Sequence, residues 1–484
     1  MRALPVLALL ASLALAEDPP KPGPGDTRPV EKALDDMGEI LKTRPEKTLA
    51  IAWVMDASGS MTDDRQRVLG KLDELLQKLS GKEVRMTVLA FDKKPRVVCP
   101  LSTDWDRVKK AIGGVGEGKG EENCMLAVRE AAKLVPTPGS YRVVVLMTDE
   151  RGDDEDDLEK TIQAVKQSQV HVFVLGRETP FGWPIGYEAD EELGFNVTVD
   201  AGVESAAIET LQKNPLCCGQ EWYPYCRKML TDPDKRPQES YFQDGDPLGC
   251  DLGRDEEVRS GFAPWAQARL CAETGGQVWL IRGKGGFDAK ALRGYEPDLC
   301  AVAEYGKRNA ADPLRKAVTE VLAEIAKGRE WKLESVGLSE GQAERLGKRA
   351  RELTGNCRKW IDRLRAARPN LPSQGEAPSK RWVAHRDLLV AQLHVLIHWL
   401  EQYALVLKEG DYPKGGDVAL APGDLRGSGE AKLEAVRALE QVMKDHPGTP
   451  WAETAAALAE GLDGFDLVAV RYGSGGAGPS AGDK

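Results

Sequence analysis

The alternation of apolar runs with helical patterns over the first third of the chain limits its possible folds more than any other feature. The runs that we expect to form strands are 49–55, 84–91, 96–101, 141–147 and 170–176. Strands that alternate with helices of about ten to fifteen residues build crossover units, and their parallel sheet is buried on both faces. The sequence therefore predicts an α/β fold with a doubly wound, mostly parallel sheet.

A chain of 484 residues is longer than one hydrophobic core usually holds, so we expect several segments. We expect a cysteine-bearing insertion within the sheet domain and an all-helical C-terminal region behind it. The predicted segments are a signal peptide at 1–16, a Pro-rich linker and short helix at 17–47, the sheet domain at 48–327 with its insertion at about 177–258, a helical region at 328–470 with one tetratricopeptide-like helix pair at 431–461, and a disordered tail at 471–484.

The first sixteen residues, MRALPVLALLASLALA, have one early arginine, a short apolar stretch and small residues at the end, as an export signal does. We therefore expect an exported protein, periplasmic or extracellular. A bilayer span needs about 20 apolar residues, and no stretch of this chain is that long, so we expect no membrane span. The net charge of −11 argues against a nucleic acid as partner.

Cysteines gather around the expected insertion. Export permits disulfides, and we predict them among Cys217, Cys218, Cys226, Cys250 and Cys271. Cys99 and Cys124 form a further candidate pair within the sheet domain. The sequence does not fix the connectivity, and with 9 cysteines at least one stays unpaired.

A buried-looking strand ends in polar residues in the stretch IAWVMDASGSMTDD, residues 51–64. Asp56 stands at the strand's carboxyl end, and Ser58 and Ser60 follow in the next loop. The run VVVLMTDE ends in the same way with Asp149. Parallel sheets present ligand sites at this edge, and oxygen-only ligands suit Mg²⁺ best, with Mn²⁺ or Ca²⁺ as alternatives to it. We predict a divalent-cation site with open positions. A simple capped turn at the following helix is the competing interpretation of DASGS.

On these residues, the stretch from 48 to about 327 resembles a von Willebrand factor A domain. Asp56, Ser58 and Ser60 match the first loop of the metal-ion-dependent adhesion site of that family, and Asp149 matches the third loop. The resemblance implies a non-enzymatic module that binds a protein partner, whose acidic side chain completes the metal shell.

The second loop of the adhesion site departs from the family pattern. Where the family usually has Gly-Gly-Thr before a helix, this chain reads GKGEENCMLAV, which places Glu122 near the position of the threonine. A third carboxylate beside the cation would weaken the attraction for an acidic ligand. The pairing of GEEN with TDERGDD also resembles a secreted bacterial subgroup of these domains.

Three other motifs have simpler interpretations. The acidic run at 153–157 is either a second cation site or, as we prefer, a solvated group at a helix N-terminus. The stretch GGVGEGKG at 113–120 resembles a phosphate loop, but Gly120 replaces the hydroxyl residue and a helix precedes it. GLSEG around Ser339 resembles a hydrolase elbow, but it fits a helix cap better.

His394 and His398 lie four residues apart on an expected helix, and Glu401 shares their face. Such a trio can hold zinc. The surrounding helix is apolar, however, and no glutamate lies between the histidines to act as a base, so we expect core packing or hydrogen bonds between helices.

We therefore predict an exported, divalent-cation-dependent binding module for adhesion or assembly. Two alternatives stay open at this point. One is a metal-assisted hydrolase that uses Glu122 or Glu150 as base; the other is an envelope scaffold in which the metal only stabilises the fold.

Overall fold

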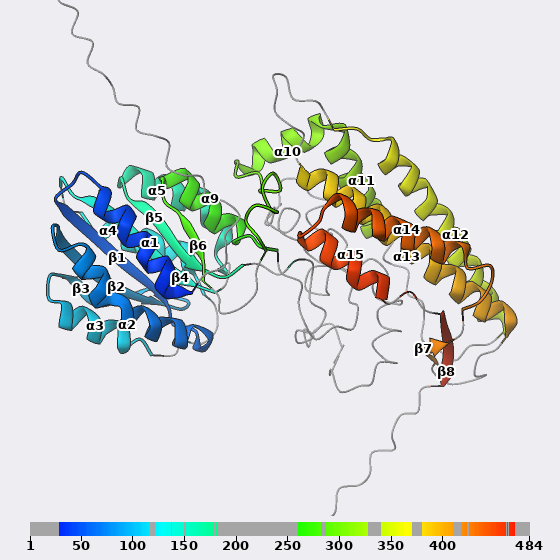
Figure 1. The fold of residues 1–484 in the computed structure, drawn as a ribbon, viewed down its shortest axis with the longest axis horizontal. Coiled ribbons are helices and arrows are strands. Elements are labelled where there is room, and N and C mark those ends of the chain that lie inside the picture. The colour runs from blue at the N-terminus through cyan, green and yellow to red at the C-terminus, as the bar shows by residue number, and fades with distance from the viewer. Residues whose placement is uncertain are drawn as a thin grey trace, which may run out of the picture.

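The chain forms a body built on one sheet and a second, helical body (Figure 1). The computed structural model describes, apart from residues 117, 119–121, 137, 150 and 151, the ranges 29–178, 181, 260–281, 287–327, 340–369, 380–410, 418–423, 425–460, 462 and 464–469. The expected export signal, most of the insertion, the helix cap at Ser339 and the C-terminal tail lie outside these residues. Within the described ranges, no helix combines the length and apolar composition that crossing a bilayer requires.

The main sheet has six strands in the order β3-β2-β1-β4-β5-β6. Its strands are β1 (Thr48–Asp56), β2 (Glu83–Phe91), β3 (Arg96–Ser102), β4 (Tyr141–Thr148), β5 (His171–Gly176) and β6 (Val278–Leu280). Strand β3 pairs antiparallel with β2, and the other pairs are parallel. The prediction of an α/β fold with a mostly parallel sheet is confirmed.

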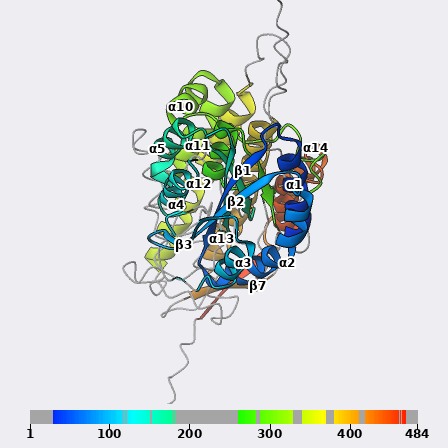
Figure 2. The same ribbon diagram turned by 90° about the vertical axis from the view of Figure 1, so that its left-hand side faces the viewer.

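Helices cover both faces of this sheet, as Figure 2 shows from the side. One face packs against α1 (Val30–Thr43), α2 (Thr62–Lys78) and α3 (Trp105–Gly113), and the other against α4 (Cys124–Lys133), α5 (Leu158–Gln167) and α9 (Trp265–Thr274). Strand β1 directs Trp53 and Met55 to the first face, and Ala52 and Val54 to the second. Since both faces are covered, nearly every residue of β1 is buried. The edge of the sheet at the strand ends is therefore where ligands can approach.

The helical body has its core around one long helix. Its helices are α10 (Val302–Ala311), α11 (Pro313–Lys327), α12 (Glu340–Ala366), α13 (Lys380–Glu409), α14 (Glu430–Asp445) and α15 (Pro450–Glu460). Residues of α13 take part in both hydrophobic clusters of this body, so α13 is buried over most of its length. Helices α14 and α15 form the helix pair that the sequence indicates near 431–461.

Two details of this body differ from the sequence expectation. Helices α10 and α11 share a core with α12 and α13, through Leu314 and Trp382 for example, and not with the sheet. The boundary expected near residue 327 is therefore too late in the chain, because Leu292 and Tyr295 already pack in the core of the helical body. Strands β7 (Val418–Gly423) and β8 (Gly464–Ala469) form a two-stranded antiparallel sheet, so the region is not all helical. Each strand is too short to show a period, and the two lie far apart in sequence.

The described cysteines do not form the expected bridges. Cys99 belongs to the cluster on the α1 face of the sheet and Cys124 to the cluster on the α4 face, so the sheet separates them and the pairing is wrong. Cys271 is a buried free thiol in α9, and burial raises its pKa. A disulfide among the insertion's cysteines, which lie outside the described residues, stays a prediction.

Candidate metal centre

Two adjacent parallel strands bring the predicted ligands to one edge of the sheet. Strands β1 and β4 pair in register up to Met55 and Met147, so Asp56 and Thr148 end the two strands side by side. Thr148 Oγ1 donates a hydrogen bond of 2.6 Å to Asp56 Oδ2. Asp149 follows directly on Thr148. The loop after β1 and the loop after β4 therefore meet at this point.

The first loop is folded tightly around Asp56, which is fully buried. Its Oδ1 accepts a hydrogen bond of 2.7 Å from the backbone N–H of Ser58. The hydroxyls of Ser58 and Ser60 lie 3.0 Å apart, at the start of a 3₁₀ turn, η1 (Gly59–Met61). One carboxylate and two hydroxyls are thus presented from a single short loop, as a cation site requires. The side chains of Ser58 and Met61, the N-cap residues of η1 and α2, form no capping hydrogen bond.

Arg65 holds the loop after β1 through its backbone carbonyls, a role that the sequence did not reveal. It is buried in the first turns of α2, and its Nη1 donates to the carbonyl of Asp56 at 2.6 Å and to the carbonyl of Ser58 at 2.9 Å. The guanidinium therefore satisfies two backbone carbonyls of the first loop. An arginine nine positions after the strand end is the only sequence signal for this contact.

Asp149 is held less completely than Asp56. Its side chain is 8% exposed, and its Oδ2 lies 3.2 Å from Nη1 of Arg177. Its Oδ1 is buried without a hydrogen bond from the part of the chain that the structure describes. A buried carboxylate oxygen that accepts no hydrogen bond destabilises the fold unless a positively charged group lies beside it. The arrangement fits a divalent cation beside Asp149.

Arg177 is the second residue that sequence reasoning missed. It follows the end of β5, and its Nη2 donates to Asp64 Oδ2 at 3.1 Å and to the carbonyl of Ser60 at 3.2 Å. Because β5 neighbours β4 in the sheet, Arg177 lies at the same edge as Asp149. A basic residue at the carboxyl end of a predicted parallel strand was the available signal.

The loop that carries Glu122 lies against the first loop. The N–H of Gly118 donates to the carbonyl of Ala57 at 2.8 Å. A Cβ at position 118 would come within 2.9 Å of Asp92 Cβ and 3.1 Å of Ala57 Cβ, so only glycine permits this approach. This glycine belongs to the phosphate-loop-like stretch, which follows helix α3 as expected. Its role is close packing rather than phosphate binding.

The backbone of Glu122 is fixed by Asp153. Asp153 Oδ2 accepts from the N–H of Glu122 at 2.6 Å, and the N–H of Asp153 donates to the Glu122 carbonyl at 2.9 Å. Glu122 is therefore held next to the loop that follows β4. Whether its carboxylate ligates a cation stays a prediction. Glu150, the other proposed base, lies outside the described residues.

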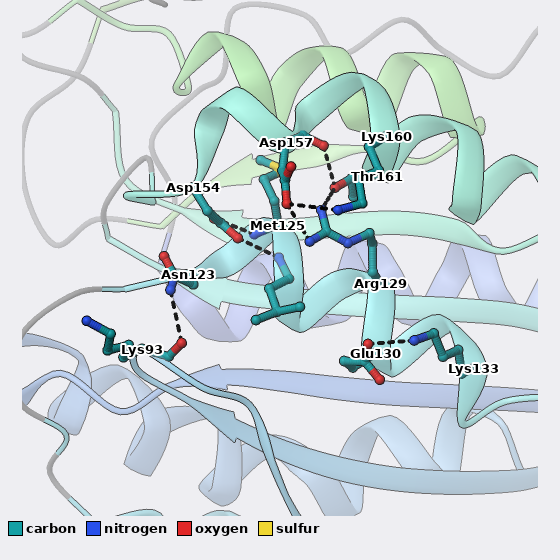
Figure 3. Close-up of polar contacts among 11 residues, drawn as sticks. Lys93, Asn123, Met125, Arg129, Glu130, Lys133, Asp154, Asp157, Lys160 and Thr161 are labelled. Carbon is teal, nitrogen blue, oxygen red and sulfur yellow. Dashed lines mark hydrogen bonds and ion pairs between the residues drawn. The ribbon is translucent and has the colours of Figure 1, made fainter.

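The acidic run holds the start of a neighbouring helix. Asp154 Oδ1 and Oδ2 accept from the backbone N–H groups of Met125 and Leu126, at 2.9 and 2.6 Å, and thereby cap α4 (Figure 3). Asp157 Oδ2 lies 2.6 Å from Nη2 of Arg129. Burial raises the pKa of Asp154 in spite of these hydrogen bonds. The run therefore serves a helix N-terminus, although this is α4 and not the helix that follows the run.

No group of three or more His, Cys, Asp or Glu side chains within the described ranges is placed to hold a metal ion by itself. The candidate centre therefore depends on the serine hydroxyls and on water as well as on carboxylates. His394 Nε2 lies 2.9 Å from Nη2 of Arg365, and Glu401 pairs with Arg358 at 2.8 Å. These contacts confirm hydrogen bonds between helices for His394 and Glu401, and His398 is fully buried, as core packing predicts.

A family model matches part of the sheet body. Residues 50–193 match the family model of the von Willebrand factor type A domain, a domain that generally mediates protein interactions rather than catalysis. No match to a curated protein was found.

Two solved structures resemble the chain at low identity. An aerotolerance-related membrane protein from Bacteroides fragilis NCTC 9343 is 16% identical, with a TM-score of 0.27, and the match covers 49% of this chain and 92% of that one. The conserved hypothetical protein BatB from Bacteroides thetaiotaomicron is 14% identical, with a TM-score of 0.28, and the match covers 58% of this chain and 99% of that one.

Proposed function

We propose that the chain is an exported protein-binding module whose partner binds at a divalent cation, with Mg²⁺ as the preferred ion. The observation that carries this proposal is the meeting of Asp56 and Asp149 at the ends of neighbouring parallel strands, with one oxygen of Asp149 buried and without a hydrogen bond from the described residues. Asp56, Asp149 and the hydroxyls of Ser58 and Ser60 would hold the ion.

These four groups leave coordination positions open. Mg²⁺ takes six oxygen ligands and keeps several waters, so water or an oxygen of a partner protein completes the shell. The bound ion would supply a point of strong attraction for such an oxygen. The chain's own residues hold the carboxylates in place, through Thr148 and the amide of Ser58 on Asp56.

Glu122 bears on which partner oxygen is preferred. If its carboxylate stands beside the ion, three carboxylates face two positive charges, and an acidic partner gains less than it otherwise would. Glu122→Gln should then strengthen binding of an acidic peptide while the ion stays bound. Unchanged affinity would assign Glu122 to the start of α4 alone.

The binding function is tested by capture of partner proteins from the extracellular or periplasmic fraction of the source cell. Immobilised full-length protein would be compared in Mg²⁺ and in EDTA, beside an Asp149→Ala variant as the matched control. We expect the same partner to be retained only by the wild-type protein in Mg²⁺. Retention that is equal in all three conditions, with a melting temperature that falls in EDTA, would favour a scaffold with a stabilising metal.

A further inference from the structure

Arg177 places a permanent positive charge where the proposed function expects a cation. Its guanidinium joins three segments, since it contacts Asp149 after β4, Asp64 in α2 and the carbonyl of Ser60 in the first loop, all within 3.2 Å. Each of these contacts lies at the edge that would receive the ion. The site therefore contains a cation of its own.

These ion pairs are more sheltered than those of an ordinary surface. The side chains of Asp149 and Asp64 are 8% and 11% exposed, and that of Arg177 is 34% exposed. Exposed ion pairs contribute little because water screens them, and the burial of both carboxylates reduces that screening. Water therefore screens the contacts of Arg177 less than it screens those of an exposed ion pair.

Asp149 has one oxygen for each of the two positive groups. Arg177 lies against Oδ2, while Oδ1 is the buried oxygen that no described residue meets. A divalent ion that binds Oδ1 would come to lie next to the guanidinium, and the two positive charges would repel each other. This repulsion weakens ion binding at Oδ1 while Arg177 stays in place, and it favours withdrawal of Arg177 from Asp149 when the ion binds.

We propose that Arg177 is a tethered counter-charge that joins the loops of the site when no divalent ion is bound and competes with that ion for Asp149. The inference rests on the proposed function, because it takes Asp149 as a ligand of the ion. Arg177 acts as a positioning residue: it sets the affinity of the site for the ion without ligating it.

The test compares full-length wild-type protein with Arg177→Gln by calorimetric titration of Mg²⁺ and by thermal melting in EDTA. We expect the dissociation constant for Mg²⁺ to fall about tenfold in the variant, which corresponds to about 1.4 kcal/mol. We also expect the variant to melt at a lower temperature in EDTA and to approach the wild type in saturating Mg²⁺. Arg142→Gln is the matched control, because Arg142 bonds Gln169 at the opposite edge of the sheet.

The results separate this inference from the proposed function. If the wild-type protein and Arg177→Gln bind Mg²⁺ with the same affinity, the inference is overturned and the proposed function stays intact. Binding by the variant alone would support the inference and contradict a cation-dependent function in the wild type. Absence of binding in both would overturn both.

A measurement on the wild-type protein covers the case in which the variant does not fold. Hydrogen exchange of the peptide 171–178 should become faster on addition of Mg²⁺, because Arg177 leaves Asp149. Unchanged exchange at a Mg²⁺ concentration that saturates the site would contradict the competition.

Discussion

Thr148 donates a hydrogen bond of 2.6 Å to one oxygen of Asp56, while the amide of Ser58 donates to the other oxygen at 2.7 Å. Both oxygens of this carboxylate are therefore oriented by the protein before any ligand arrives. Within the described residues, Asp149 meets Arg177 at one of its oxygens and has no hydrogen-bond partner at the other. The two carboxylates therefore differ: the protein orients both oxygens of Asp56, and we expect Asp149 to be the carboxylate that responds to an added ion.

Thr148→Val is expected to weaken Mg²⁺ binding by about tenfold or more, because residues that orient metal ligands typically contribute that much to affinity. Valine has nearly the same shape as threonine, so the buried position keeps its packing. Calorimetric titration of both proteins with Mg²⁺ measures the effect. Equal affinities would show that the hydroxyl of Thr148 does not prepare Asp56 for an ion.

Asp149→Ala should remove the stabilisation that Mg²⁺ gives to the wild-type protein. An ion present at a hundred times its dissociation constant adds about 2.7 kcal/mol to the free energy of unfolding. Melting in Mg²⁺ and in EDTA gives this difference for each protein. Asp63→Ala is the control, because Asp63 is an exposed carboxylate in the first turn of α2. A Mg²⁺ shift that survives in Asp149→Ala would exclude Asp149 as a ligand.

Asp154→Ala should lower the free energy of unfolding by about 1–3 kcal/mol, because two backbone N–H groups at the start of α4 lose their acceptor. Asp156→Ala, at an exposed neighbouring position of the same acidic run, should change it by less than about 0.5 kcal/mol. Urea unfolding of the two variants measures the difference. Equal effects would mean that the run acts through its total charge and not through the cap.

A hydrogen-bonded chain of two buried groups, Tyr295 and His446, and the half-buried Asp387 connects segments of the helical body. Tyr295 donates from its hydroxyl to His446 Nδ1 at 2.9 Å, and His446 Nε2 donates to Asp387 Oδ2 at 3.0 Å. Tyr295→Phe should cost about 1–2 kcal/mol of unfolding free energy, because it leaves a buried ring nitrogen without its donor. Tyr403→Phe should cost less, since its hydroxyl makes no hydrogen bond within the described residues.

A double-mutant cycle with Asp387→Asn tests whether the three groups act together. The effects of Tyr295→Phe and Asp387→Asn should not add, and the difference should be about 0.5 kcal/mol or more. Additive effects would show two independent hydrogen bonds on His446 rather than one network.

Acidification should destabilise the protein through its buried histidines. Burial, and then the neighbouring Arg365 guanidinium, lowers the pKa of His394, and burial lowers the pKa of His171. The unfolded pKa is about 6.5, so the unfolded chain takes up protons first as the pH falls. The contribution of each group is complete above about pH 6.5 and is lost below it.

The measurement is the free energy of unfolding at pH 7.5 and at pH 5.5. His394→Gln should show a smaller decrease than the wild-type protein, because glutamine does not titrate. A decrease of the same size in both would contradict a role for His394 in the pH dependence.

The sequence predicts the sheet and the position of its site, because both depend on local patterns. Apolar runs mark the strands, and a strand that ends in Asp56 or Asp149 places a carboxylate at the edge. Arg65 and Arg177 could not be predicted in the same way. Their partners are set by the packing of α2 and β5 against other elements, and nothing in the local sequence of an arginine indicates which carbonyl or carboxylate it will meet.

The errors have the same origin. The expected pair of Cys99 and Cys124 follows from their presence in one domain, but the sheet between them decides the outcome. The helices after residue 301 continue the chain of the sheet body, and only their buried faces show that they pack against α12 and α13. Contacts between distant segments are the part of the structure that a periodic pattern does not contain.

Phe181 lies four positions after Arg177 and packs its ring against Trp451 of α15, with the ring centroids 5.0 Å apart. Arg177, at one end of this short stretch, pairs with carboxylates at the edge of the sheet, and Phe181, at the other end, packs in the core of the helical body. A partner that shifts Trp451 and an ion that shifts Arg177 would therefore both move the segment 177–181. If the two sites are coupled in this way, thermodynamic reciprocity makes each ligand alter the affinity for the other by the same factor, so that a partner bound at the helical body would change the affinity for the ion.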